Sequence, residues 1–202
     1  METTETIRER LKRQRKQLSP GQRQDMNRQL CRHLIDSRQL KHARTLAAYL
    51  PFGGEPDLTP VLRHAVDQGI QPLLPVVVNE PEPKLHFRVW QPGESLTKNR
   101  FGIPEPASGA KEIPARALDL ILLPLVAFDA HGNRIGMGAG YYDRTFAFLL
   151  DSEPPPRPVL IGTGWSFQQL PRLEPQAWDV PLDAVVTEHG WHGPWRRAAA
   201  KA

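Results

Sequence analysis

The chain has 202 residues, of which 40% are hydrophobic, and a formal net charge of +4. A single cysteine, Cys31, excludes an intrachain disulfide, and no apolar run approaches the ~20 residues of a membrane span. The charged N-terminus also lacks the apolar core of a signal peptide. We therefore expect one domain over residues 1–202, with a frayed tail over 195–202, as a cytoplasmic monomer that binds no membrane.

The first half of the chain predicts alternating helices and strands. Residues 6–18 are rich in Arg and Lys and predict a basic helix, and Ser19, Pro20 and Gln22 have the pattern of a helix start. Apolar residues at helical spacing continue that second helix to about residue 37. A short strand over 45–50, a turn-rich loop over 51–56 and a helix ending at Gly69 follow.

The second half continues the alternation. We predict strands over 73–78, 85–89, 118–126, 159–161 and 184–187, and a helix over 141–150. The stretch 91–114, which contains several prolines and glycines, is interpreted as an ordered excursion or lid. This order is typical of an α/β fold with a mainly parallel, Rossmann-like sheet. Ligands bind such sheets at the carboxyl ends of the strands, where the loops beginning at Pro51 and Phe128 would lie.

The most informative segment is a glycine loop after the strand at 118–126. Gly136, Gly138 and Gly140 stand at every second position, with Arg134 before them and Tyr141 after them. Glycines let a ligand approach the backbone closely, and successive N–H groups favour an anion such as phosphate. The loop is neither a Walker A loop nor the dinucleotide fingerprint, because its spacing matches neither. A flexible turn is the alternative.

Three carboxylates outside the loop are candidate site residues. Asp143, at the start of the predicted helix, either favours the helix dipole or binds Mg²⁺ beside phosphates. Asp183 is either a loop residue or a second Mg²⁺ ligand. Glu55 is either a solvated loop carboxylate or an acceptor for a substrate amine or amide. The histidines show no zinc spacing, His189 to His192 is expected to be a surface loop, and no protein nucleophile can be assigned.

The basic N-terminal helix raises the alternative of an RNA-binding protein. That alternative is disfavoured because residues 6–18 carry no aromatic side chains for stacking on bases. We expect no nucleic-acid partner and assign the positive charge to a small anionic substrate instead.

Several segments follow one another in an order that identifies a family. They are Arg15–Ser19 (RKQLS), Leu50–Glu55 (LPFGGE), Asn99–Pro106 (NRFGIPEP), Leu123–Arg144 with the glycine loop, Gln168–Pro171 (QQLP) and Trp178–Glu188 (WDVPLDAVVTE). With them the chain resembles the 5-formyltetrahydrofolate cyclo-ligase family over nearly its whole length. One departure is Thr4, where family members often carry a lysine.

The resemblance implies a three-layer α/β/α sandwich and the ATP- and Mg²⁺-dependent conversion of 5-formyltetrahydrofolate to 5,10-methenyltetrahydrofolate, with release of ADP and phosphate. It implies the following site residues: for ATP, Arg8, Arg134, Ile135, Gly136, Met137, Gly138, Ala139, Gly140, Tyr141 and Tyr142; for folate, Leu50, Glu55 and residues 137–141; for magnesium, Asp143 and Asp183; and for catalysis, Arg134, Tyr141 and Asp143. A nucleotide- or folate-binding protein without turnover, on the same fold, is the main alternative.

Overall fold

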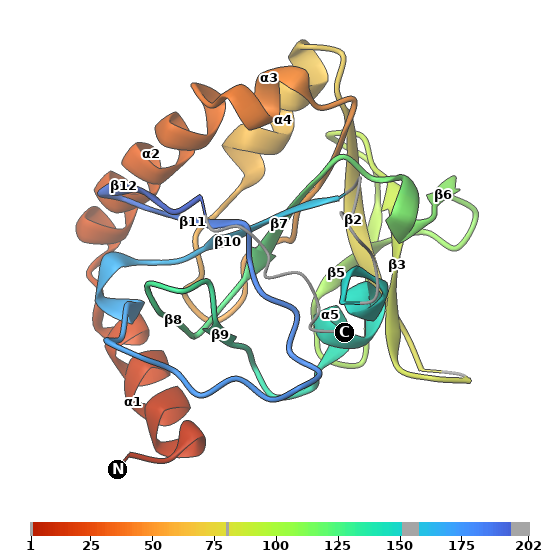
Figure 1. Ribbon diagram of the computed structural model, residues 1–202. Coiled ribbons are helices and arrows are strands. Elements are labelled where there is room, and N and C mark those ends of the chain that lie inside the picture. Colours follow the sequence, from red (N-terminus) through yellow and green to blue (C-terminus); the bar gives the residue numbers. More distant parts are fainter. Residues whose placement is uncertain (1, 80, 151–157, 195–202) are drawn as a thin grey trace.

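A central eight-stranded sheet organises the molecule (Figure 1). The computed structural model describes residues 2–79, 81–150 and 158–194; the expected frayed tail lies outside them. In spatial order the strands are β12 (Gly190–His192), β11 (Ala184–Thr187), β10 (Val159–Thr163), β7 (Leu120–Pro124), β1 (Thr45–Ala47), β2 (Gln71–Val78), β3 (Lys84–Val89) and β6 (Glu112–Ile113). The strands from β11 to β2 run parallel, whereas β12, β3 and β6 are antiparallel. The predicted mainly parallel α/β sheet is confirmed.

Two helical layers cover the sheet because its strands alternate their side chains between two faces. The helices are α1 (Thr4–Gln17), α2 (Pro20–Ile35), α3 (Arg38–His42), α4 (Thr59–Asp67) and α5 (Tyr141–Phe146). On β7, Leu122 packs in the core with α2, α3 and α4, whereas Ile121 and Leu123 pack in the core with α5. On β10, Ile161 likewise packs in the core with α2, α3 and α4, and Leu160 packs in the core with α5. The result is the expected arrangement of three layers.

The helix boundaries follow local chemistry. Ser19 caps α2, its side chain accepting from the Gln22 backbone while the Gln22 side chain accepts from the Ser19 backbone, as the sequence predicts. The predicted helix over 141–150 is shorter in the structure: α5 ends at Phe146 and a 3₁₀ turn follows over Ala147–Leu149. Gly69, after α4, has the left-handed φ of +74° expected of a residue that ends a helix.

Several strand predictions need correction. The strand predicted over 118–126 is confined to β7, which ends at Pro124 because proline has no N–H for the next ladder bond. The strand predicted over 45–50 ends at Ala47, and the one over 159–161 extends to Thr163. The predicted surface loop 189–192 contains the edge strand β12, which pairs with β11.

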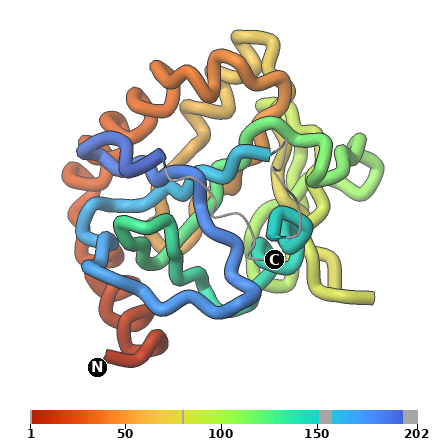
Figure 2. The backbone as a smooth tube through the Cα atoms, viewed as in Figure 1, coloured from red at the N-terminus to blue at the C-terminus, as the bar shows by residue number. Residues whose placement is uncertain are grey.

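Two small hairpins stand apart from the main sheet. In the excursion 91–114, β4 (Leu96–Lys98) pairs with β5 (Pro104–Pro106), so the excursion is ordered as expected. The other hairpin pairs β8 (Ala127–Phe128) with β9 (Arg134–Ile135), just before the glycine loop. Figure 2 shows α1 running beside this second hairpin and the segment after β10, where Leu11 is buried among Val126, Ile135 and Leu173.

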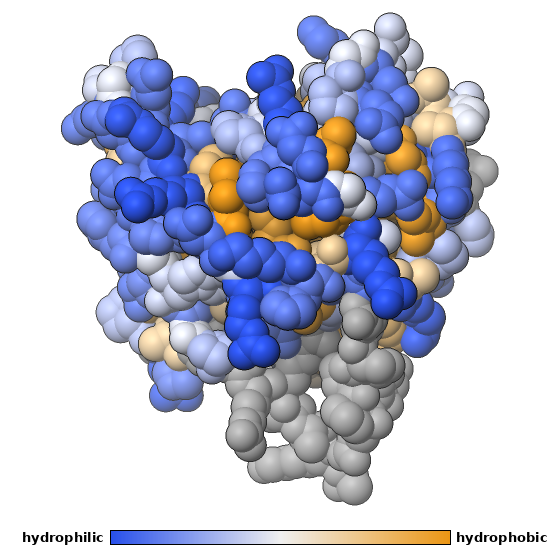
Figure 3. Space-filling model, turned by 90° about the horizontal axis from the view of Figure 1, so that it is seen from above, coloured by the Kyte–Doolittle hydropathy of each residue, from blue (hydrophilic) through white to orange (hydrophobic). Residues whose placement is uncertain are grey.

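One face of the molecule is mainly hydrophilic. Seen from the end at which α3 and α4 lie, the hydrophobic residues are concentrated in the middle and toward one side, among mostly hydrophilic side chains (Figure 3). Within the described ranges, no helix combines the length and the apolar character needed to cross a membrane.

Candidate active site

The β8–β9 hairpin gives the glycine loop a rigid starting point. The carboxylate of Asp129 is fully buried and accepts hydrogen bonds from the backbone N–H groups of His131, Asn133 and Leu173 and from Asn133 Nδ2. Burial by itself raises the pKa of Asp129, but these donors stabilise the anion and the net pKa is lowered. Asp129 therefore ties the hairpin to the segment after β10.

The glycine loop has the backbone geometry that its sequence predicts. Gly138 and Gly140 have φ values of +99° and +64°, which residues other than glycine rarely adopt. Tyr141 begins α5 immediately afterwards. In the part of the chain that the structure describes, no protein group accepts a hydrogen bond from the backbone N–H groups of residues 136–140. These donors are therefore available to an anionic ligand.

Arginine side chains surround the loop. Arg8 of α1 donates from Nε to the carbonyl of Gly136 at 2.9 Å. Arg144 donates to the carbonyls of Ala139 and Pro83, the latter at 2.7 Å. Both guanidinium groups are fixed beside the loop's N–H groups and bring positive charge to the loop, with Arg8 also pairing through Nη1 with the exposed Glu5 carboxylate at 2.9 Å.

Arg134 and Asp143 form an ion pair at the base of the loop. Arg134 Nη2 lies 2.6 Å from Asp143 Oδ1, and their side chains are 6% and 23% exposed. Arg134 Nη1 also donates to the Val180 carbonyl, and the Val180 N–H donates to Asp143 Oδ1 at 3.2 Å. Arg134 thus has intramolecular partners and holds Asp143 in place, a role that the sequence pattern did not indicate.

Asp183 has a different environment from Asp143. Its Oδ2 accepts from the N–H of Leu160 at 2.7 Å, near the amino end of β10. The two proposed magnesium ligands therefore accept hydrogen bonds from different parts of the chain, Asp143 from Arg134 and Val180, and Asp183 from Leu160. Among the residues at 2–79, 81–150 and 158–194, no group of three or more His, Cys, Asp or Glu side chains could hold a metal ion.

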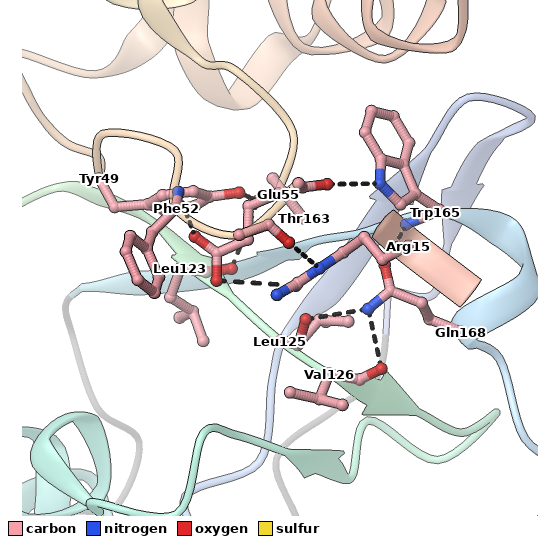
Figure 4. A network of polar contacts seen from close by, with 12 residues as sticks. Arg15, Tyr49, Phe52, Glu55, Leu123, Leu125, Val126, Thr163, Trp165 and Gln168 are labelled. Carbon is pink, nitrogen blue, oxygen red and sulfur yellow. Dashed lines mark hydrogen bonds and ion pairs between the residues drawn. The ribbon is translucent and has the colours of Figure 1, made fainter. Parts of the chain in front are cut away.

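Glu55 is buried in the loop that follows β1 (Figure 4). Its side chain is 7% exposed, Oε2 accepts from the N–H of Phe52 at 3.1 Å, and Oε1 lies 3.7 Å from Arg15 Nη1. Burial raises the pKa of Glu55, and the Arg15 guanidinium opposes that rise. The interpretation of Glu55 as a solvated loop carboxylate is therefore wrong. Leu50, at the start of the same loop, is half-buried against the core.

Helix α1 links the glycine loop with the Glu55 loop, because Arg8 donates to the Gly136 carbonyl and Arg15 donates to the Gly53 carbonyl, each at 2.9 Å. Burial raises the pKa of the Tyr142 phenol, and the negative charge of Glu55 raises it further. Tyr49, two residues after β1, bonds through its hydroxyl to Thr163 Oγ1 at 2.9 Å. The structure brings together two loops that the sequence placed only at the same edge of the sheet.

Tyr141 points to the excursion instead. Its hydroxyl accepts from Arg100 Nη2 at 2.6 Å and donates to Asn79 Oδ1 at 2.9 Å, and Phe101 meets its ring edge-on. Arg100 and Phe101 form the tip of the β4–β5 hairpin. The hairpin is anchored by Glu105, which accepts hydrogen bonds from Val77 of β2 and from Asn99.

Sequence reasoning missed several residues of this site. Phe52 and Phe101 expose apolar side chains on two of the loops, as the predicted Met137 does on the third, and Arg15 lies beside Glu55. A signal was present only for Arg15, which follows Arg8 by two helical turns and so shares its face of α1. The contacts of the aromatic residues depend on loop conformation, which has no comparable periodicity.

The comparisons with known proteins identify the family. The model of the 5-formyltetrahydrofolate cyclo-ligase family matches residues 1–188. The chain belongs to that family. The 5-formyltetrahydrofolate cyclo-ligase of Escherichia coli K12 is 34% identical over 178 residues, covering 88% of this chain and 96% of the relative. Its counterpart from Haemophilus influenzae is 31% identical over 181 residues, covering 89% and 95%.

Solved structures of the family share the fold. The Aquifex aeolicus 5,10-methenyltetrahydrofolate synthetase superposes with a TM-score of 0.80 at 28% identity, covering 98% of this chain and 95% of that one. A Mycoplasma pneumoniae 5,10-methenyltetrahydrofolate synthetase, at 20% identity, has a TM-score of 0.73, with coverage of 92% and 98%, and supports the fold. The family membership and architecture expected from the sequence motifs are confirmed.

Proposed function

We propose that this chain cyclises 5-formyltetrahydrofolate to 5,10-methenyltetrahydrofolate, using ATP and Mg²⁺ and releasing ADP and phosphate. Family membership supports the activity. The observation that carries the proposal is that α1 contacts both loops, with Arg8 donating to the Gly136 carbonyl of the glycine loop and Arg15 donating to the Gly53 carbonyl beside the buried Glu55. A loop suited to phosphates and a carboxylate suited to an amide-like donor thus border one site.

ATP would bind along the glycine loop. Its phosphates would accept hydrogen bonds from the N–H groups of residues 136–140, while Arg8 and Arg144 neutralise their charge. The flanking residues of the loop, Ile135, Tyr141 and Tyr142, would also line the ATP site. Thr4 lies in the first turn of α1 and supplies no cation there, so Arg8 would provide the contact from this helix.

Asp143 fits a magnesium site. Its Oδ1 is occupied by Arg134 and Val180, but no hydrogen bond from the described part of the chain reaches Oδ2. Magnesium commonly takes one or two protein carboxylates plus phosphate oxygens and waters, so a magnesium site here does not require a cluster of three protein ligands. Asp183 is the proposed second carboxylate. A bound ion would neutralise charge on the transferred phosphoryl group.

Folate would lie between the glycine loop and Glu55. The buried carboxylate would accept hydrogen bonds from N–H groups of the pterin, with Leu50 packed beside it. The exposed side chains of Phe52, Phe101 and Met137 would cover the apolar faces of the substrate, and the β4–β5 hairpin would act as the lid predicted for the excursion.

The chemistry requires positioning rather than a protein nucleophile. The formyl group on N5 is an amide and a poor electrophile. Transfer of the γ-phosphoryl group of ATP to its oxygen gives an iminium phosphate and ADP. The lone pair of N10 then attacks the activated carbon, the ring closes, and the C–O bond breaks to release phosphate with loss of the N10 proton. Asp143 and Tyr141 would face the reacting groups, whereas Arg134 acts by positioning Asp143.

An absorbance assay for methenyltetrahydrofolate tests the proposal. Product should form only when 5-formyltetrahydrofolate, ATP and Mg²⁺ are all present, and omission of any one should abolish it. If calorimetry shows that ATP and folate bind but no product forms, the binding-protein alternative replaces the enzyme.

A further inference from the structure

One face of α1 contacts both loops of the proposed site. Arg8, Leu11 and Arg15 stand at helical spacing on that face. Leu11 is buried against the β8–β9 hairpin and anchors the helix. On either side of it, Arg8 bonds to the carbonyl of Gly136 in the glycine loop and Arg15 bonds to the carbonyl of Gly53 beside Glu55, each at 2.9 Å.

The contact of Arg15 with the Glu55 loop is tight. Its side chain is only 2% exposed. Gly53 and Gly54 adopt φ values of +59° and +84°, and a Cβ on Gly54 would lie 3.2 Å from Cγ of Arg15. Both positions therefore favour glycine for their backbone conformation, and Gly54 also because Arg15 takes the space that a side chain would need.

One nitrogen of the Arg15 guanidinium is buried without a hydrogen bond to any residue that the structure describes. Nη1 is buried and has no hydrogen-bond partner in the described part of the chain, and it lies 3.7 Å from Glu55 Oε1 (Figure 4). A buried charge without a partner is costly, so the carboxylate is the natural compensation for this cation. Burial lowers the pKa of Arg15, and the positive charge of Arg23, on α2, lowers it further. Burial raises the pKa of the phenols of Tyr49 and Tyr142, and the charge of Glu55 raises it further.

We propose that Arg15 is a positioning residue for the folate pocket, which holds the Glu55 carboxylate ionised and oriented toward the N–H donors of the pterin. It acts through two contacts, the Gly53 carbonyl and the ion pair itself. The proposal deepens the proposed function and rests on it, since Glu55 must bind substrate for Arg15 to matter in this way.

Steady-state kinetics of Arg15→Met, Arg15→Lys and the control Arg13→Met test the idea. Arg13 lies on the same helix but is exposed. Arg15→Met should raise the KM for folate about tenfold to hundredfold, the range of a lost charge-assisted contact, with the KM for ATP and kcat changed less than about threefold. Arg13→Met should match the wild type.

The pH profile separates positioning from a merely structural role. Without the cation the pKa of Glu55 rises further, so the acid limb of kcat/KM for folate should move to higher pH in Arg15→Met. Arg15→Lys keeps the charge, so its acid limb should stay in place while its folate KM rises, because an ammonium group cannot span both contacts. In a Glu55→Gln background, Arg15→Met should leave the limb unmoved.

Two results would overturn the inference. One is an unmoved acid limb in Arg15→Met, and the other is an equal shift in the Glu55→Gln background. If thermal unfolding shows that Arg15→Met does not fold, a wild-type folate KM in Arg15→Lys refutes the proposal instead. Failure of the proposed function looks different: the wild type then makes no methenyltetrahydrofolate, or Glu55→Gln binds folate as the wild type does.

Discussion

Replacing Asp143 with alanine should reduce both stability and turnover. The change removes the acceptor of Arg134 Nη2 at 2.6 Å and of the Val180 N–H at 3.2 Å. Arg134 is only 6% exposed, so its guanidinium would be left without a counter-charge in a site that water hardly reaches. The ion pair connects the base of the glycine loop with α5, so its loss should loosen the loop as well.

The size of the destabilisation follows from the burial of the pair. Breaking a buried ion pair costs about 3–5 kcal/mol, and breaking an exposed one costs about 0–1 kcal/mol. Because the Asp143 side chain is 23% exposed, solvent offsets part of the loss and we expect about 2–3 kcal/mol. For a chain of this size that corresponds to a decrease in Tm of roughly 4–12 °C.

Thermal unfolding and the product assay measure the two effects separately. Asp143→Asn should lose less stability than Asp143→Ala, because its amide oxygen still accepts from Val180, but kcat should fall about a hundredfold or more in both if the carboxylate binds magnesium. As a control, Glu174→Ala removes an exposed carboxylate and should behave as the wild type. An unchanged Tm in Asp143→Ala refutes the reasoning on the ion pair, and full activity at limiting Mg²⁺ refutes the metal assignment.

Other predictions address the loops. Gly138→Ala forces a side chain to a φ of +99° and should raise the KM for ATP about tenfold, whereas Gly136→Ala, with no neighbour within 4 Å and no positive φ, should change it much less; equal effects would contradict the backbone argument. Glu55→Gln should raise the folate KM about tenfold to hundredfold, with the ATP KM unchanged, and a larger effect on ATP would reverse the assignment of the pocket. Phe101→Ala removes the edge contact with Tyr141 and should raise the folate KM about two- to tenfold; wild-type kinetics would exclude the lid.

Local patterns determined much of the fold in advance. The alternation of apolar runs indicated the helices and parallel strands, the Ser19–Gln22 pattern indicated the start of α2, and the alternating glycines indicated a loop with left-handed residues. Each of these features depends on residues close together in the chain. The short edge strand β12 was missed because its formation depends on pairing with β11 rather than on any pattern of its own.

The sequence by itself also determined the family and the two loops at the edge of the sheet, because motifs and periodicity are properties of the chain. Only the tertiary structure decided how the charged groups pair. Arg134 pairs with Asp143, and Arg15 with Glu55, because the packing of α1, α5 and the loops brings them together. Whether Glu55 is solvated or buried could not be predicted, since burial depends on what the rest of the chain places over a residue.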